Sequence, residues 1–172
     1  MNVYLIGFMG TGKTAVSKEL AKLLPYRLVD MDSAIEDLAA MSIPDIFATM
    51  GEEKFRQMET QLLTALGEEG AQIVSCGGGV VLRPENVEIM KKTGSTVLLT
   101  ATAETVWNRT KNNDHRPLLR DKKGPEDIQP MLDAREPKYK AAADMTIATD
   151  DLKPSEIAAK IVEQLAKEDK LN

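Results

Sequence analysis

Cysteine and histidine are nearly absent from this sequence of 172 residues, which contains one of each. The single cysteine, Cys76, permits no intrachain disulfide and no cysteine-based zinc site. With His115 as the only histidine, transition-metal chemistry also lacks its usual ligands. The sequence therefore excludes a disulfide scaffold and directs attention away from zinc enzymes.

Long apolar runs and an excess of positive charge are also missing. No stretch approaches the roughly 18 consecutive apolar residues that a membrane-spanning helix needs. The chain has 22 Lys and Arg against 27 Asp and Glu, whereas a surface for phosphate backbones needs clustered basic residues. The first residues show no basic leader or cleavage site. We therefore expect a cytoplasmic monomer that binds neither nucleic acid nor membrane, with small molecules as its partners.

In its other features the composition is that of an ordinary globular protein, and residues 1–172 are predicted to form one domain. Short β-rich runs alternate with amphipathic segments, which predicts an α/β fold around a central parallel sheet of five strands. The second, third and fourth runs are apolar enough to predict strands buried on both faces. The expected strands are Val3–Ile6, Arg27–Asp30, Gln72–Cys76, Thr96–Thr100 and Met145–Thr149.

Two segments are too long or too polar to be simple connections. Ser33–Glu69 lies between the second and third expected strands and contains a helical apolar stripe after Gly51. Lys111–Gly124 is charged and without periodicity, so it predicts a mobile surface loop that acts as a lid. Within the first segment, residues 33–61 are expected to form a substrate-binding insertion. Helices are expected to begin at Pro84, Pro125 and Pro154.

The segment Gly7–Thr14 matches the phosphate-binding pattern G-x-x-x-x-G-K-[ST] at every defined position. It follows an expected strand and precedes an expected helix, so its backbone N–H groups and the helix dipole would face the phosphates of a nucleotide. Lys13 would reach the β and γ phosphates, and the Thr14 hydroxyl would ligate Mg²⁺. The pattern predicts an ATP-dependent phosphotransferase. The loop residues expected to bind nucleotide are Gly10, Thr11, Gly12, Lys13, Thr14 and Ala15.

A phosphate-binding loop alone does not distinguish a kinase from a GTPase, but the chain has no Asn-Lys-x-Asp run for guanine. The third strand ends at Cys76 without the aspartate that commonly serves magnesium. Asp30 and Asp32 follow the second strand, and an extended segment would place both carboxylates on one side. Asp30 would then lie nearer the metal and Asp32 nearer a substrate hydroxyl. The alternative is that Asp32 and Ser33 cap a helix.

Two further patterns admit a functional and a structural interpretation. Arg56 and Glu59 are three residues apart on the expected insertion helix, so Glu59 would orient the guanidinium, unless the two form a surface ion pair. Gly77–Gly79 indicates close approach of a ligand to the backbone, or a tight turn. Cys76 is expected to be a buried packing residue and His115 a solvated loop residue.

Six motifs follow one another along almost the whole chain. They are Gly7–Thr14, Asp30-x-Asp32, Phe55-Arg56-x-x-Glu59, Gly77–Gly79, Arg116-Pro117-Leu118-Leu119 and Arg135-x-Pro137-x-Tyr139. In this order they resemble the shikimate kinase family. Cys76 departs from the family, which more often has threonine before the glycines.

The resemblance implies a three-layer fold like that of nucleoside monophosphate kinases, with ATP and Mg²⁺ used to phosphorylate the 3-hydroxyl of shikimate in aromatic amino acid biosynthesis. By position, Lys13, Asp32 and Arg116 would be catalytic, and Thr14 with Asp30 would hold the metal. Beyond the loop, nucleotide contacts would come from Arg109, Arg116 and Lys153, the last in a segment like the family's adenine loop, Asp150–Pro154. Shikimate would be bound by Asp32, Arg56, Gly77, Gly78, Gly79 and Arg135.

Two alternatives remain open at this stage. One is another small-molecule kinase of the same superfamily, for gluconate or a nucleoside monophosphate. The other is a nucleotide-binding switch without catalysis, although such a protein has no use for Asp32, Arg56 and Arg135 together.

Overall fold

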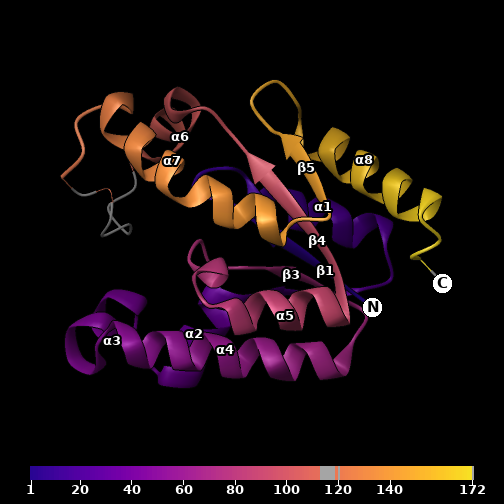
Figure 1. Ribbon diagram of the computed structural model, residues 1–172, viewed down its shortest axis with the longest axis horizontal. Helices are drawn as coiled ribbons and strands as arrows, with labels where there is room; N and C mark the ends of the chain where they lie inside the picture. The colour runs from indigo at the N-terminus through magenta and orange to yellow at the C-terminus, as the bar shows by residue number, and fades with distance from the viewer. Residues whose placement is uncertain (113–118, 120, 172) are drawn as a thin grey trace.

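The computed structural model describes residues 1–112, 119 and 121–171. Its centre is a parallel sheet of five strands in the order β2-β3-β1-β4-β5 (Figure 1). This arrangement confirms the predicted fold class. The strands are β1 (Asn2–Ile6), β2 (Arg27–Asp30), β3 (Gln72–Ser75), β4 (Gly94–Thr100) and β5 (Met145–Ala148).

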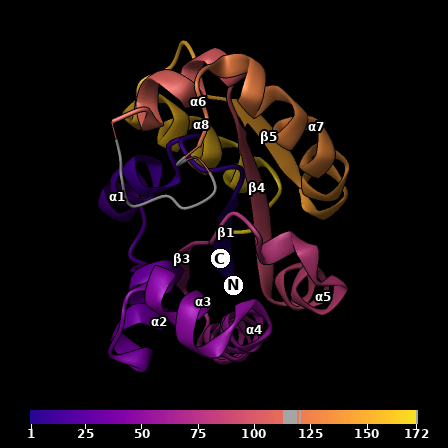
Figure 2. The ribbon, with the colours of Figure 1, turned by 90° about the vertical axis from the view of Figure 1, so that its left-hand side faces the viewer.

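The sheet is buried between two layers of helices, as the alternation of side chains along β1 shows. Val3 and Leu5 pack with α1 (Lys13–Leu23) and α8 (Pro154–Lys167), whereas Tyr4 and Ile6 face a second core on the opposite side. Figures 1 and 2 show the two helical layers, and both place the termini close together. The helices facing Tyr4 and Ile6 include α4 (Glu52–Glu69), α5 (Pro84–Thr93), α6 (Ala103–Thr110) and α7 (Pro125–Ala142).

One expectation about the strands is wrong. β3 and most of β4 are buried, but β2 is not, since Arg27 is exposed and Leu28 only half-buried. The strand order explains the difference, because β2 lies at the sheet edge and pairs with β3 alone. A short apolar run does not reveal whether its strand is central or lateral.

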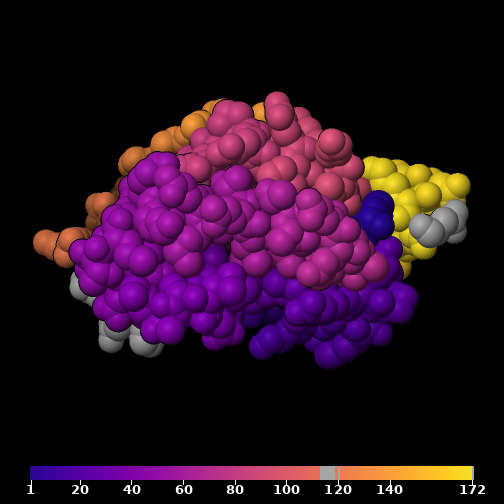
Figure 3. Space-filling model, turned by 90° about the horizontal axis from the view of Figure 1, so that it is seen from below, coloured from indigo at the N-terminus to yellow at the C-terminus, as the bar shows by residue number. Residues whose placement is uncertain are grey.

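Three helices connect β2 and β3, where the sequence predicted one helix after Gly51 and left open another after Asp32 and Ser33. They are α2 (Met31–Ala39), α3 (Ile43–Met50) and α4. Ile35, Ile46 and Phe55, one from each helix, form a small core of their own. These helices project from one side of the sheet and cover most of the face seen in Figure 3.

The three helix starts predicted from proline are confirmed, at α5, α7 and α8. Helix α7 also contains Pro130 and Pro137 in its interior. A short 3₁₀ helix, η1 (Val80–Leu82), follows the glycine triplet. Within the part of the chain that the structure describes, no helix has the length and apolar character to cross a membrane.

Candidate active site

The loop after β1 has the backbone that its glycines predict. Gly10 and Gly12 adopt φ values of 78° and 99°, which side chains disfavour, and α1 begins at Lys13 immediately afterwards. A Cβ added to Gly10 would lie 2.7 Å from Thr110 Cγ2. The Lys13 ammonium donates to the carbonyls of Gly7 (2.7 Å) and Phe8 (3.0 Å), so it lies folded over the loop. The segment is therefore shaped as an anion cradle at a helix N-terminus.

The outer rim of this loop is tied to the end of β5 by Arg109 and Thr149. Arg109 donates to the Gly10 carbonyl, the Thr149 hydroxyl and the Thr149 carbonyl, each at 3.1 Å. The Thr149 hydroxyl in turn lies 2.8 Å from the Thr11 carbonyl. Sequence reasoning missed Thr149, which it placed at the end of a strand. Arg109 lies beside the phosphate loop, and its predicted contact with the nucleotide stays a prediction.

The segment after Thr149 lies at the same edge of the sheet. The Asp150 carboxylate accepts from the Thr102 backbone N–H (2.9 Å). Although burial alone would raise the pKa of Asp150, hydrogen bonds from Thr105 and Thr102 lower it, so the carboxylate stays ionised. Lys153 is exposed and precedes α8, where its N–H donates to Glu156 (2.7 Å).

The segment after β2 differs from the extended geometry expected for Asp30 and Asp32. Helix α2 begins at Met31, and the Asp30 carboxylate caps it by accepting from the Ser33 N–H (3.0 Å). Asp32 lies one residue into the helix and directs its carboxylate toward Gly77. The capping interpretation was right about the helix and wrong about the residue, because Asp30 is the cap.

The glycine triplet brings the predicted acceptor residues together from three parts of the chain. A Cβ added to Gly77 would lie 2.9 Å from Asp32 Oδ1. One added to Gly78 would lie 3.6 Å from Arg135 Nη1, and one added to Gly79 would overlap the Arg56 guanidinium. Asp32, Arg56 and Arg135 therefore surround the triplet, where backbone without side chains is required.

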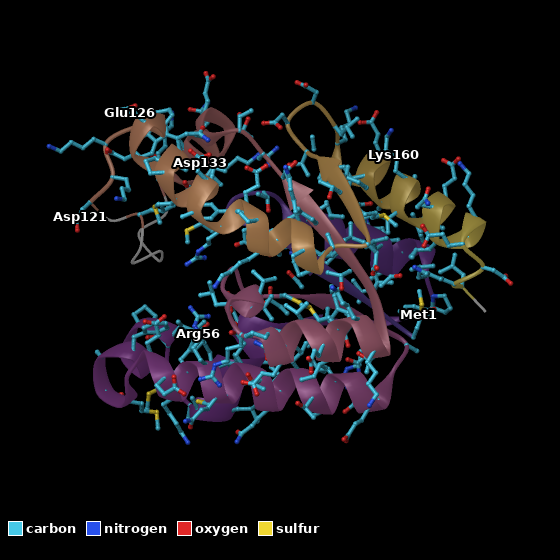
Figure 4. The ribbon with its side chains drawn as sticks, in the orientation of Figure 1. Met1, Arg56, Asp121, Glu126, Asp133 and Lys160 are labelled. Atoms are coloured by element: carbon cyan, nitrogen blue, oxygen red, sulfur yellow. The ribbon has the colours of Figure 1, made fainter. Side chains whose placement is uncertain are left out.

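Arg56 and Glu59 form a buried ion pair, which contradicts the surface interpretation. Their side chains join at 3.1 Å, with Glu59 fully buried and Arg56 only 12% exposed. Burial raises the pKa of Glu59, the positive charge of Arg56 opposes the rise, and Asp32 adds to it. Arg56 Nε and Glu59 Oε2 have no hydrogen-bond partner within the described part of the chain. In Figure 4 the Arg56 side chain lies on the side of α4 toward α7.

Arg135 is held by two aromatic residues. Its guanidinium carbon lies 5.8 Å from the centroid of Phe8, in the phosphate-binding loop. Tyr139, one turn further along α7, donates to the Gly78 carbonyl at 2.5 Å. Sequence reasoning quoted Tyr139 only as part of a motif and gave it no role.

The remaining predicted residues have simpler outcomes. Cys76 is buried and its pKa is raised by that burial, so it is a packed thiol as expected. Arg116 and His115 lie outside the described residues.

Thr14 and Ala15 are exposed in the first turn of α1, beside Lys13. Across the described ranges, no three His, Cys, Asp or Glu side chains gather as a metal cluster.

A phosphate-binding loop next to a glycine triplet surrounded by two arginines and an aspartate is typical of a phosphotransferase of the P-loop class. A family model described as shikimate kinase matches residues 9–166. The chain therefore belongs to the shikimate kinase family, whose members are ATP-dependent kinases acting on shikimate, and the resemblance seen in the sequence is confirmed.

Individual relatives agree with this assignment. The chain is 41% identical over 163 residues to the shikimate kinase of Thermodesulfovibrio yellowstonii, covering 95% of this chain and 94% of the relative. Identity to the enzyme of Geobacter sulfurreducens is 43% over 148 residues, covering 86% and 81%. A structure of Acinetobacter baumannii shikimate kinase in complex with shikimate matches with a TM-score of 0.91, 36% identity and coverage of 99% and 95%.

Proposed function

We propose that the protein transfers the γ-phosphoryl group of ATP to the 3-hydroxyl of shikimate, giving shikimate 3-phosphate and ADP for aromatic amino acid biosynthesis. One observation carries the proposal. Asp32, Arg56 and Arg135 converge on the glycine triplet, and the position of a Cβ on Gly78 would lie 3.8 Å from the Gly7 carbonyl of the phosphate loop. The acceptor pocket is thus adjacent to the nucleotide site.

The acceptor pocket matches the chemistry of a hydroxylated carboxylic acid. Arg56 and Arg135 supply planar guanidinium groups suited to a carboxylate. The buried Arg56 Nε lacks a partner among the residues described, and a ligand oxygen would satisfy it. Asp32, exposed at the start of α2, would accept hydrogen bonds from ring hydroxyls and orient the attacking one. Gly77–Gly79 would contribute backbone contacts.

The nucleotide would lie over Gly10–Ala15, with Lys13 leaving the Gly7 and Phe8 carbonyls to contact the β and γ phosphates. Arg109 and Lys153, at the rim formed by α6 and the start of α8, would contact the adenosine part. We assign Arg116 to charge stabilisation during transfer and residues 111–124 to a lid that excludes water.

Thr14, in the first turn of α1, and Asp30, at the end of β2, are the residues proposed to hold Mg²⁺. Thr14 offers a hydroxyl and Asp30 a carboxylate, both hard oxygen donors. Mg²⁺ binds few protein ligands and takes the rest from phosphates and water, which agrees with the lack of a larger carboxylate cluster in the described chain. Bound there, the ion would neutralise charge on the phosphate oxygens.

The proposal also covers oligomeric state, location and domain organisation. We expect a monomer in the cytoplasm, with a single domain over residues 1–172 and a substrate-binding insertion near residues 33–61.

The decisive assay is ADP release on addition of shikimate to protein, ATP and Mg²⁺. We expect turnover with shikimate and none above background with gluconate or nucleoside monophosphates. Arg116→Ala should lower turnover far more than shikimate affinity. Activity with another acceptor only, or shikimate binding without ADP release, would refute the proposal.

A further inference from the structure

Tyr139 contacts the glycine triplet that lines the proposed pocket. Its side chain is buried on α7, and its hydroxyl donates to the Gly78 carbonyl across 61 residues of sequence. Arg135 lies four residues earlier on the same helix, hence on the same face. The hydroxyl is therefore located where the helix bearing Arg135 meets the backbone of Gly78.

The same hydroxyl also interacts with Arg135. Burial raises the pKa of Tyr139, while a hydrogen bond from Arg135 and the positive charge of that guanidinium act in the opposite direction. A phenol has one proton to donate and lone pairs to accept with. Tyr139 donates its proton to the Gly78 carbonyl, and a Cβ added to Gly78 would lie 3.6 Å from Arg135 Nη1 and 3.7 Å from the Tyr139 hydroxyl, so the phenol and the guanidinium flank the same backbone. A phenylalanine of the same ring size would lack the hydrogen bond to Gly78.

We propose that Tyr139 is a positioning residue that fixes the spacing between Gly78 and Arg135 and thereby sets the affinity for the acceptor substrate. The inference rests on the proposed function, since it assigns Gly78 and Arg135 to shikimate. Tyr139 acts through these two groups and takes no part in phosphoryl transfer. Its loss should therefore affect shikimate binding more than turnover or ATP binding.

A second buried tyrosine provides a matched control. Tyr4 lies in β1, and its hydroxyl accepts from Asn2 (2.9 Å) and hydrogen-bonds Thr93 (2.6 Å). Neither partner belongs to the proposed pocket. Tyr4→Phe and Tyr139→Phe thus each remove one buried hydroxyl together with its hydrogen bonding, and both should lower the melting temperature.

The test measures KM for shikimate and for ATP, kcat, and the Kd for shikimate by calorimetry in the wild type and both variants. We expect Tyr139→Phe to raise KM and Kd for shikimate about three- to tenfold, the effect of one lost hydrogen bond, with KM for ATP unchanged. Tyr4→Phe should leave all three binding constants unchanged. In an Arg135→Lys background, Tyr139→Phe should cost less than it does alone, because its effect passes through Arg135.

The outcomes separate this inference from the proposed function. Normal wild-type turnover together with an unchanged KM for shikimate in Tyr139→Phe would overturn the positioning role alone. An equal rise in KM in Tyr4→Phe would also overturn it, because loss of stability would then explain both. A wild type that releases no ADP with shikimate would refute the proposed function, and this inference with it.

Discussion

The two halves of the proposed active site are carried by elements that are packed to different extents. The phosphate-binding loop connects β1 to α1, and both elements are embedded in the large cores that cover the two faces of the sheet. The acceptor side depends in part on α2 and α3, whose own core consists of Ile35, Ile46 and Phe55. Leu38 on α2 is 71% exposed and Met50 on α3 is 48% exposed, and of the apolar residues of these two helices only Met31 and Ala34, both near the start of α2, join the core that contains Tyr4 and Ile6.

This difference in packing suggests that the two regions can be altered separately. A site on the main sheet keeps its geometry as long as the whole domain is folded. A site carried by weakly packed helices opens locally at a lower free energy. Substitutions in the two regions should therefore be separable, because one set changes chemistry or global stability and the other changes acceptor binding.

The largest effect is expected on the nucleotide side, from Lys13→Met. The substitution removes the ammonium that would neutralise the transferring phosphoryl group, and we expect kcat to fall about a hundred- to thousandfold. Lys22→Met is the matched control, on the same helix, where Lys22 forms an exposed ion pair with Glu19. The ADP-release assay measures both. Retention of more than about a tenth of wild-type turnover in Lys13→Met would contradict the assigned role.

On the acceptor side, Ile46→Ala tests the small core directly. Ile46 is fully buried there, and its truncation should cost about 2–5 kcal/mol. We expect KM for shikimate to rise while KM for ATP stays within about twofold. Ile161→Ala, equally buried on α8 in the main core, should lower the melting temperature without a selective change in either KM. Parallel changes in the two variants would show that the insertion helices and the sheet form one cooperative unit.

A smaller, pH-dependent effect is expected from Glu59→Gln. Because the pKa of Glu59 is raised above its ordinary 4.5 in the folded state, this group favours folding at low pH. Its contribution to stability falls as pH rises from 4.5 through the folded-state pKa. The ionised form orients Arg56, so Gln should raise KM for shikimate about tenfold at neutral pH. The difference in KM for shikimate between Glu59→Gln and the wild type should become smaller as the pH is lowered.

Glu53→Gln, on the exposed part of the same helix, is the control for this profile. Its KM for shikimate should follow the wild type at every pH, and loss of its exposed ion pair with Arg83 should change the melting curve only slightly. If KM for shikimate had the same pH dependence in Glu59→Gln as in the wild type, Glu59 would have no role in orienting Arg56 for the substrate.

The success of sequence reasoning differed between the two regions for a physical reason. The phosphate-binding loop is local, since its glycines, Lys13 and the adjoining strand and helix are consecutive in sequence. The five strands were also found to within two residues at each end, because each is a short β-rich run between clear breaks, whether it is buried or lies at the sheet edge.

The helices of the insertion were harder to predict from sequence, because tertiary contacts rather than local patterns determine their structure. Helices α2 and α3 contain nine and eight residues, too few to show a clear period, and Pro44 reads as a break although it occupies the first turn of α3. The burial of Glu59 depends on Arg56 and the glycine triplet folding over it. No sequence pattern marks a carboxylate as buried. Tyr139 and Thr149 were missed for the same reason, since their partners lie 61 and 138 residues away.

The smallest effect should come from Thr149→Val, which sharpens the comparison from the nucleotide side. The Thr149 hydroxyl links the Thr11 carbonyl of the phosphate loop to Arg109 and also lies 3.1 Å from the Thr100 carbonyl, and valine keeps the shape while removing all three contacts. We expect KM for ATP to rise about three- to tenfold, KM for shikimate to stay constant, and stability to fall by about 1 kcal/mol.

Thr96→Val on β4 is the control for this substitution. The Thr96 hydroxyl oxygen is buried and has no hydrogen-bond partner among the residues that the structure describes, so valine there should be neutral or stabilising. Thermal melts and paired KM measurements distinguish the two variants. A rise in KM for shikimate in Thr149→Val would mean that the two halves of the site are coupled through the phosphate-binding loop. A loss of ATP affinity confined to Thr149→Val would establish that the nucleotide side is fixed by its own contacts, independently of the insertion helices.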